Sequence, residues 1–426
     1  MRQEVLFEVE LPPIPNRKLP TNLTTRKHAV HRWMNFTAGY SPEFVINCLE
    51  REGTSGLVLD PFAGMGTTLV SANSRHLPAI GFDPHPHAAM MCRAKTQTRS
   101  VECIDTIEVL LSGLKPRESV EDFWSEAQLK FLSKLIPDTD ELKRLATARS
   151  LESSLNPTER PLFRLVVTRL LEGACGAATD GIYKAPTSKK RAIRVEDLLP
   201  EVVSQIRTDI NEVEANDWAC SEVIEDSSER MPNLSSDSVS HIITSPPYLN
   251  NFDFAEMSRM ELYFWGYANS WGDITRQVRT KLIVNTTTAP TEYKRDQVRW
   301  RGILRGSVLD AAQTYVDELS EARAARGGSK DYERLVFPYF AQMQNVLSEC
   351  YRVLSPGGAL DLVVSDSALY GIHIHTERLL AEILFELGYS TVDIVRLRSR
   401  GDRWNLAKRA GAKDPLGEFH ITARKG

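Results

Sequence analysis

The chain has 426 residues, of which 42% are hydrophobic and 25% charged, and its formal net charge is −4. This is the composition of a globular protein, long enough for one large domain with insertions or for two to three smaller domains. No apolar run reaches the length of a transmembrane helix, and the N-terminal residues lack the apolar core of a signal peptide, so we expect a cytoplasmic protein. The small negative charge disfavours a polyanionic partner unless cations gather on a local basic face.

The cysteine and histidine patterns do not predict a metal site. Six cysteines are scattered along the chain without a Cys-x-x-Cys pair, at positions 48, 92, 103, 175, 220 and 350. Neither a metal site nor a disulfide framework is therefore expected. Two histidine pairs, within 85–87 and at 373 and 375, have no cysteine or acidic cluster beside them, and we interpret them as polar or helix-capping residues.

In chain order, residues 1–27 hold four prolines and predict an extended arm. A loop then leads into a helix that Ser41 can cap, with Pro42 at its first position. A strand at 57–60, a small-residue turn at 62–68, a helix from 69 to 75 and a second strand at 78–83 follow. Two strands that end in acids around a glycine-containing turn make half of a nucleotide-binding βαβ unit.

The segment from 95 to 215 differs, because amphipathic stretches near 120–147 and 161–177 predict helices, interrupted by a polar basic loop at 183–194. The strand–helix alternation then resumes, with a polar basic insertion at 250–330. The remaining predicted elements are strands at 220–226, 239–245, 359–367, 390–398 and 418–425 and helices at 339–354 and 376–389. This alternation predicts an α/β fold with a mostly parallel sheet covered on both faces, whose last two strands form an antiparallel hairpin.

The first motif is the turn from Asp60 to Thr68, with the sequence Asp-Pro-Phe-Ala-Gly-Met-Gly-Thr-Thr. Gly64 and Gly66 let the backbone approach a ligand closely, and the helix N-terminus after them offers unpaired N–H groups to an anion. Asp83 ends the next strand, where an acid binds ribose hydroxyls in dinucleotide folds. A tight turn without a ligand is the alternative for the glycines alone, but together these features favour a bound nucleoside.

The second motif is Thr244-Ser245-Pro246-Pro247-Tyr248, at the carboxyl end of a predicted strand, where α/β sheets bind their ligands. The prolines fix the backbone and have no N–H group that would compete with their carbonyls. Ser245 and the Pro246 carbonyl can accept hydrogen bonds, and the Tyr248 ring offers a face for stacking. An aromatic amine fits this arrangement, and the alternative is a rigid turn with a core tyrosine.

Together and in this order, the two motifs resemble those of the amino-methyltransferase family that modifies DNA at cytosine N4 or adenine N6. The resemblance implies a Rossmann-like methyltransferase fold, S-adenosylmethionine as cofactor and double-stranded DNA as substrate. Adenine enzymes more often carry Asp or Asn where this chain has Ser245, which favours cytosine N4. The implied catalytic residues are Ser245, Pro246, Pro247 and Tyr248, and the implied cofactor-binding residues are Phe36, Thr37, Ala38, Asp60, Pro61, Phe62, Ala63, Gly64, Gly66, Thr67, Thr68, Asp83 and Asp226.

The resemblance assigns 28–94, 219–266 and 333–426 to the catalytic domain. We expect 95–218 to be a helical insertion for target recognition and 267–332 to be a basic insertion that contacts DNA. Cations with interleaved aromatic rings suit phosphate contacts and occasional stacking, although a solvated surface loop is the alternative. The candidate DNA-binding residues are Arg276, Arg279, Lys281, Lys294, Arg295, Arg299, Arg301, Arg305, Lys189, Lys190, Arg400 and Arg403.

The reaction implied by the resemblance is methyl transfer to the exocyclic amine of a base flipped out of the duplex. Acceptors at Ser245 and the Pro246 carbonyl would hold both amine hydrogens, so that catalysis is mostly positioning and desolvation. The alternatives are adenine N6 methylation, a methyltransferase acting on RNA or on a protein glutamine amide, and a catalytically silent DNA-binding subunit. A cognate restriction or defence-system partner is also compatible with the family.

Overall fold

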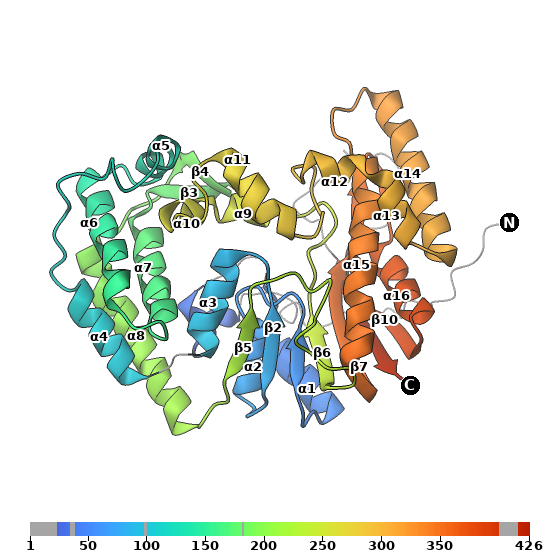
Figure 1. Ribbon diagram of the computed structural model, residues 1–426, viewed down its shortest axis with the longest axis horizontal. Coiled ribbons are helices and arrows are strands. Elements are labelled where there is room, and N and C mark those ends of the chain that lie inside the picture. Colours follow the sequence, from blue (N-terminus) through green and yellow to red (C-terminus); the bar gives the residue numbers. More distant parts are fainter. Residues whose placement is uncertain (1–23, 35–38, 98–99, 181–182, 400–415) are drawn as a thin grey trace.

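The computed structural model describes residues 24–34, 39–97, 100–180, 183–399 and 416–426 (Figure 1). Its centre is a seven-stranded sheet with the order β10-β11-β7-β6-β1-β2-β5. The strands are β1 (Val58–Asp60), β2 (Ala79–Phe82), β5 (Ser221–Ile224), β6 (Val239–Thr244), β7 (Leu354–Ser365), β10 (Tyr389–Ser399) and β11 (Gly417–Lys425). Neighbours from β5 to β7 pair in parallel, and β11 is antiparallel to both β7 and β10. The expected α/β fold is therefore confirmed: a Rossmann-like, mostly parallel sheet that ends in an antiparallel hairpin.

Both faces of the sheet are covered by helices, because successive residues of each buried strand point to opposite sides. Val58, Ile243 and Val363 pack with α1 (Pro42–Glu52), α2 (Thr67–Asn73) and α3 (Pro86–Thr96). Their neighbours Leu59 and Ile242 pack with α15 (Glu333–Val353) and α16 (Thr376–Glu386) on the other face. This two-sided burial explains why the parallel strands read as continuous apolar runs in the sequence.

A helical module lies to one side of the sheet, on the left in Figure 1, and its hydrophobic core continues into residues of α2 and α3 such as Val70 and Met91. It contains α4 (Val101–Leu111), α5 (Glu126–Leu135), α6 (Thr139–Ser150), α7 (Arg160–Ala174) and α8 (Val195–Ala215). The polar segment predicted as a loop is in part a hairpin of β3 (Ala177–Asp180) and β4 (Tyr183–Lys189). Lys184 turns inward there and its Nζ lies 2.6 Å from Oε1 of Glu261. The burial of Lys184 depends on a carboxylate 77 residues away in the sequence, so the polar residues around Lys184 do not predict it.

The polar insertion predicted at 250–330 is helical and divides between two regions. Figure 1 shows α9 (Phe254–Met257), α10 (Arg259–Phe264) and α11 (Trp271–Asp273) beside the helical module. It also shows α12 (Thr291–Arg295), α13 (Gln297–Ile303) and α14 (Gly306–Arg326) beside α15. A small hairpin of β8 (Ser367–Leu369) and β9 (Ile372–Ile374) was not predicted. Short helical turns complete the described elements: η1 (Thr25–Lys27), η2 (His31–Trp33), η3 (Leu151–Ser154), η4 (Ile274–Val278) and η5 (Arg279–Lys281).

Helix ends follow local hydrogen bonding. Ser41 caps α1 as predicted, with its hydroxyl accepting from the backbone N–H of Phe44 at 3.2 Å. Helix α15 begins before the predicted 339, because it accommodates Pro338 in its second turn. The missing N–H of Pro338 would leave the Arg334 carbonyl without a helical partner, and Gln297 Nε2 donates to that carbonyl at 3.1 Å. No helix among the described residues is long and apolar enough to cross a membrane.

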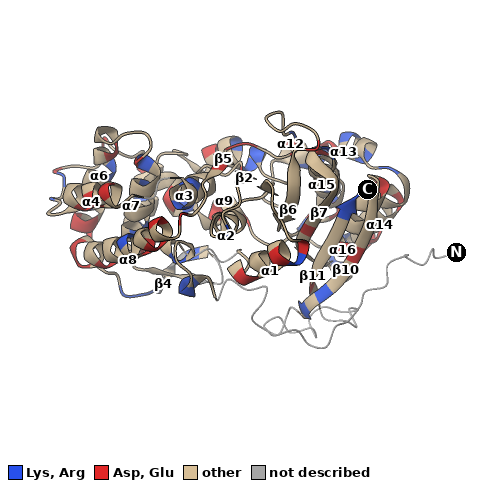
Figure 2. Ribbon diagram, turned by 90° about the horizontal axis from the view of Figure 1, so that it is seen from below, with Lys and Arg blue, Asp and Glu red and all other residues tan. Residues whose placement is uncertain are grey.

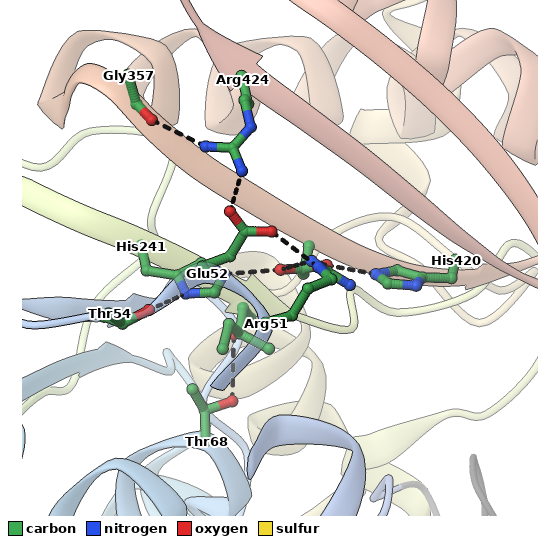
Figure 3. A network of polar contacts seen from close by, with 10 residues as sticks. Arg51, Glu52, Thr54, Thr68, His241, Gly357, His420 and Arg424 are labelled. Atoms are coloured by element: carbon green, nitrogen blue, oxygen red, sulfur yellow. Dashed lines mark hydrogen bonds and ion pairs between the residues drawn. The ribbon is translucent and has the colours of Figure 1, made fainter. Parts of the chain in front are cut away.

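An ion-pair network joins α1 to the strands β6, β7 and β11 (Figure 3). Asp361 of β7 accepts hydrogen bonds from Nε2 of His241 at 2.6 Å, Nε2 of His420 at 2.5 Å and Nη2 of Arg51 at 2.6 Å. Burial alone would raise the pKa of Asp361, but the bonds from His241 and His420 outweigh it and hold the pKa well below its usual range. Cys48, Asp361 and His420 each bring a ligand atom within 4.8 Å of the others. Because both Asp361 oxygens already accept from cations or imidazoles, we interpret the group as an ion-pair cluster.

Candidate active site

The two sequence motifs open onto one cavity of about 340 Å³ at the carboxyl ends of β1, β2 and β6. The glycine turn contributes Phe62, Ala63, Gly64, Met65 and Thr67 to its wall. The double-proline turn contributes Ser245, Pro246, Pro247 and Tyr248. Segments about 180 residues apart in the sequence are thus brought to one site, as the arrangement of a parallel sheet predicts.

Both glycines of the first turn have a backbone conformation that side chains disfavour, with φ of 51° at Gly64 and 85° at Gly66. A Cβ atom on Gly66 would also lie 2.8 Å from Sγ of Cys92, which is on α3. Gly66 therefore allows close packing of the turn against α3, and it does not line the cavity. Gly64 lines the cavity and donates its N–H to Oδ2 of Asp83 at 2.9 Å.

Asp83 follows β2 and lines the cavity, where the sequence predicted a ligand-binding acid. Its second carboxylate oxygen accepts the backbone N–H of His85 at 2.8 Å. Burial raises the pKa of Asp83 to about 7, although the two backbone hydrogen bonds oppose that rise. A carboxylate can accept about four hydrogen bonds, so it keeps acceptor capacity for hydroxyl groups in the cavity.

Asp60 and Thr68 were also predicted to bind the cofactor, but they do not line the cavity. Asp60 is 1% exposed and accepts hydrogen bonds from Oγ1 of Thr68 and Oγ1 of Thr244, both at 2.6 Å, and from the N–H of Phe62 at 3.0 Å. Burial raises the pKa of Asp60, and the hydrogen bonds oppose that rise. Asp60 thus connects the two motifs through buried hydrogen bonds beneath the cavity wall.

The remaining residues predicted to bind the cofactor either do not line the cavity or lie outside the described residues. Pro61 and Asp226 are absent from the cavity wall, and Asp226 is exposed, with its carboxylate accepting its neighbour's N–H. Ser227 and Ser228 line the cavity in place of Asp226. Phe36, Thr37 and Ala38 lie outside the described residues, and the wall begins directly after them with Gly39 and Tyr40.

Sequence reasoning missed Glu418, an acid of the cavity wall at the start of β11. The Tyr248 hydroxyl donates to Oε1 of Glu418 at 2.9 Å, and Nε of Arg398 donates to Oε2 at 2.7 Å. Ser245 Oγ makes a longer contact of 3.4 Å with the Tyr248 hydroxyl. No local motif surrounds Glu418, and only its place in the terminal hairpin, next to a strand end, hinted at the site.

Two phenylalanines form an aromatic wall of the cavity. Phe252 and Phe254 line the cavity, and their ring centres lie 6.3 Å apart in an edge-to-face arrangement. Asp253 between them caps α9 by accepting the N–H of Glu256 at 3.0 Å. The wall gives the cavity apolar surface on which a planar ring can pack.

His85, the first of the paired histidines near Asp83, caps α3 as predicted. Nδ1 of His85 accepts the N–H of Ala88 at the start of α3, and Nε2 lies 2.8 Å from Oγ of Ser258. Burial lowers the pKa of His85 to about 3 and that of His87 to about 4. Both imidazoles are therefore neutral at physiological pH.

The predicted DNA-binding residues fall into three groups. Exposed ones are Lys189, Lys190, Arg276, Lys281, Arg295, Arg299, Arg301 and Arg305, and Lys281 also lines the cavity. Arg279 is 5% exposed, pairs with Asp253 at 2.9 Å and stacks on Trp271, while Lys294 pairs with Asp331 at 3.0 Å. Arg400 and Arg403 lie outside the described residues. Figure 2 marks Lys and Arg positions on α13 and Asp and Glu positions along α4 and α8.

The strand order defines a Rossmann-like α/β fold, with the shared cavity at the carboxyl ends of its parallel strands. No family model matches the sequence. Over 90% of its length the chain is similar to the type II methyltransferase M.BsoBI of Geobacillus stearothermophilus, with 23% identity and 83% of that protein covered. The type II methyltransferase M.AvaI of Anabaena variabilis is 24% identical, with the same two coverages of 90% and 83%.

Among solved structures, an S-adenosylmethionine-dependent methyltransferase from Methanosarcina mazei superposes with a TM-score of 0.29 and 8% identity. The superposition covers 89% of this chain and 96% of that one. The fold of this chain is defined by its own strand order and pairing.

Proposed function

We propose that this chain is a site-specific DNA methyltransferase that transfers a methyl group from S-adenosylmethionine to the exocyclic amine of a flipped base, with cytosine N4 as the target. The observation that carries the proposal is the single cavity shared by the glycine turn and the double-proline turn. Similarity to type II methyltransferases over nine tenths of the chain supports it. So does the resemblance of both motifs to those of DNA amino-methyltransferases.

The glycine-turn half of the cavity fits the cofactor. The Asp83 carboxylate keeps acceptor capacity for ribose hydroxyls, and Gly64 allows close approach of the backbone. Phe62 and Tyr40 add aromatic surface to the same wall. When bound, S-adenosylmethionine supplies an electrophilic methyl group on a sulfonium centre.

The double-proline half fits a base amine. Ser245 Oγ and the Pro246 carbonyl are the acceptors that would orient the two amine hydrogens. The Tyr248 ring, with Phe252 nearby on the wall, offers stacking surface that offsets part of the few kcal/mol needed to extrude the base. Methylation at carbon 5 would need a cysteine nucleophile, and none of the cysteines, all of which are described, lines the cavity.

Positively charged side chains near the cavity support a nucleic-acid substrate. Lys281 lies on the wall, and the exposed arginines of 276–305 extend from the same insertion. Such cations suit phosphate contacts, which position the duplex without reading its sequence. The helical module and the basic insertion remain our proposed DNA-contacting regions.

Incubation of the protein with tritiated S-adenosylmethionine and, separately, DNA, RNA and protein tests the proposal. We expect label in DNA alone, and nucleoside separation should place it in N4-methylcytosine. Label in N6-methyladenine would show that the target base is adenine and not cytosine, while the proposed reaction, methylation of an exocyclic amine, would stand. Cofactor binding without transfer to any DNA would contradict the proposed enzyme and favour a silent DNA-binding subunit.

A further inference from the structure

Glu418 is the one acid of the described cavity wall that lies beside the double-proline turn and belongs to neither motif. It is 4% exposed, and each of its carboxylate oxygens has a partner. Oε1 accepts from the Tyr248 hydroxyl at 2.9 Å and Oε2 from Nε of Arg398 at 2.7 Å. A buried acid with a fixed geometry beside the catalytic turn calls for a chemical explanation.

The backbone around Glu418 is held firmly. The N–H of Gly417 donates to Oδ1 of Asp366 at 2.8 Å, and the Gly417 carbonyl accepts from Oγ of Ser365 at 2.8 Å. In the hairpin register Arg398 of β10 stands directly opposite Glu418 of β11. The hairpin and the end of β7 therefore fix where the carboxylate points.

The carboxylate also sets the direction of the hydrogen bonds that lead to the substrate. An ionised carboxylate only accepts, so the single O–H of Tyr248 must donate to Glu418. The phenol oxygen can then accept from Ser245 Oγ, which lies 3.4 Å away. With its proton turned toward Tyr248, Ser245 presents lone pairs to the cavity, as an acceptor of an amine hydrogen must.

We propose that Glu418 is a positioning residue for methyl transfer, acting through Tyr248 and Ser245 to hold Ser245 as an acceptor and to take up the proton that the amine loses. The inference rests on the proposed function. In the step, a nitrogen–carbon bond forms as the donor's carbon–sulfur bond breaks, with sulfur keeping the electron pair. The nitrogen's proton passes to Ser245 while the Ser245 proton moves to Tyr248 and the Tyr248 proton to Glu418. Glu418 becomes a carboxylic acid and returns the proton to solvent.

The test combines Glu418→Gln, Tyr248→Phe and the double variant, compared by single-turnover methylation of DNA. Each single change should lower the rate about 100-fold, the lower end of the range for proton-transfer groups. The double variant should be no slower than Tyr248→Phe, because that change already breaks the series of hydrogen bonds from Ser245 to Glu418. Glu418→Asp, which keeps an acceptor-only group, should recover part of the loss.

A readout without turnover separates chemistry from folding. Fluorescence of 2-aminopurine at the target base should rise equally with wild type and Glu418→Gln, because the Tyr248 ring is retained. Glu349→Gln is the matched control, since its carboxylate also pairs with an arginine, Arg352, at 2.8 Å on α15 away from the cavity. Its rate should equal that of wild type.

The outcomes separate this inference from the proposed function. Rates within twofold of wild type for Glu418→Gln, or losses that multiply in the double variant, overturn the role of Glu418 while the proposed function stands. A wild-type protein that methylates no DNA overturns the proposed function and the inference together.

Discussion

Oγ1 of Thr244 donates a 2.6 Å hydrogen bond to Oδ1 of Asp60, joining the ends of β6 and β1. Thr68 donates to the other oxygen of the same carboxylate. The last residue before the double-proline turn is thereby tied to the first residue of the glycine turn. The buried Asp60 carboxylate therefore holds the two turns in a fixed position relative to each other.

Replacement of Asp60 by alanine should destabilise the fold by about 2–4 kcal/mol, because buried hydroxyl and N–H donors lose their acceptor. Urea-induced unfolding measures the change. Asp226→Ala is the control, since this acid is exposed, and it should stay within about 0.5 kcal/mol of wild type. Equal effects of the two substitutions would contradict the structural role of Asp60.

Cofactor affinity should depend on the protonation of Asp83. Its pKa is raised to about 7, so the protonated form dominates below that pH and offers a weaker acceptor to ribose hydroxyls. If the ionised form binds, affinity should rise about fivefold from pH 6 to pH 7 and about twofold from pH 7 to pH 8, in step with the ionised fraction of Asp83. Titration calorimetry at pH 6, 7 and 8 provides the measurement.

Asp83→Asn should bind the cofactor weakly and without this pH dependence. The same raised pKa has a stability consequence of defined sign. A carboxyl group with a raised folded-state pKa favours the fold at low pH, and that contribution disappears as the pH rises from about 4 to 7. In the absence of cofactor, thermal unfolding of wild type but not of Asp83→Asn should show this decline.

Tyr248→Ala should keep cofactor affinity and lose most turnover. The substitution removes a stacking surface that contributes about 1–3 kcal/mol per base in single-stranded nucleic-acid sites. It also removes the donor to Glu418. Calorimetry with the cofactor and single-turnover kinetics with DNA check the two halves of the prediction, and an unchanged rate would refute the stacking role.

The exposed and buried arginines of the basic insertion should behave differently. Arg299 and Arg301 are exposed on α13, and their replacement by alanine should reduce the salt dependence of DNA binding by about one unit of slope for each phosphate that is no longer neutralised. Arg279→Ala should instead cost about 3–5 kcal/mol of stability, because it leaves the buried Asp253 without its partner. Salt titrations and unfolding curves on the same variants distinguish the two roles.

The sheet and the cavity could be predicted because their signals are local. Apolar runs ending in acids marked β1 and β2, and the two turns carried their own motifs. The partners of buried charges could not be predicted in this way. Lys184 and Arg279 read as surface cations, and both are paired with distant carboxylates. Asp60 read as a ligand because it begins a motif, whereas its neighbours consume its acceptor capacity. The hairpin itself was predicted, but the register that sets Glu418 opposite Arg398 could not be derived from the sequence.

The contacts of β4 have a mechanical consequence. Lys184 is paired with Glu261 of α10, and the adjacent Tyr183 hydroxyl accepts the N–H of Asp253, between the two phenylalanines of the aromatic wall. The helical module is thereby coupled to the aromatic wall of the cavity. A displacement of the helical module would therefore be passed to the aromatic wall through two adjacent residues of β4, so that a ligand bound to the module would also change the shape of the cavity.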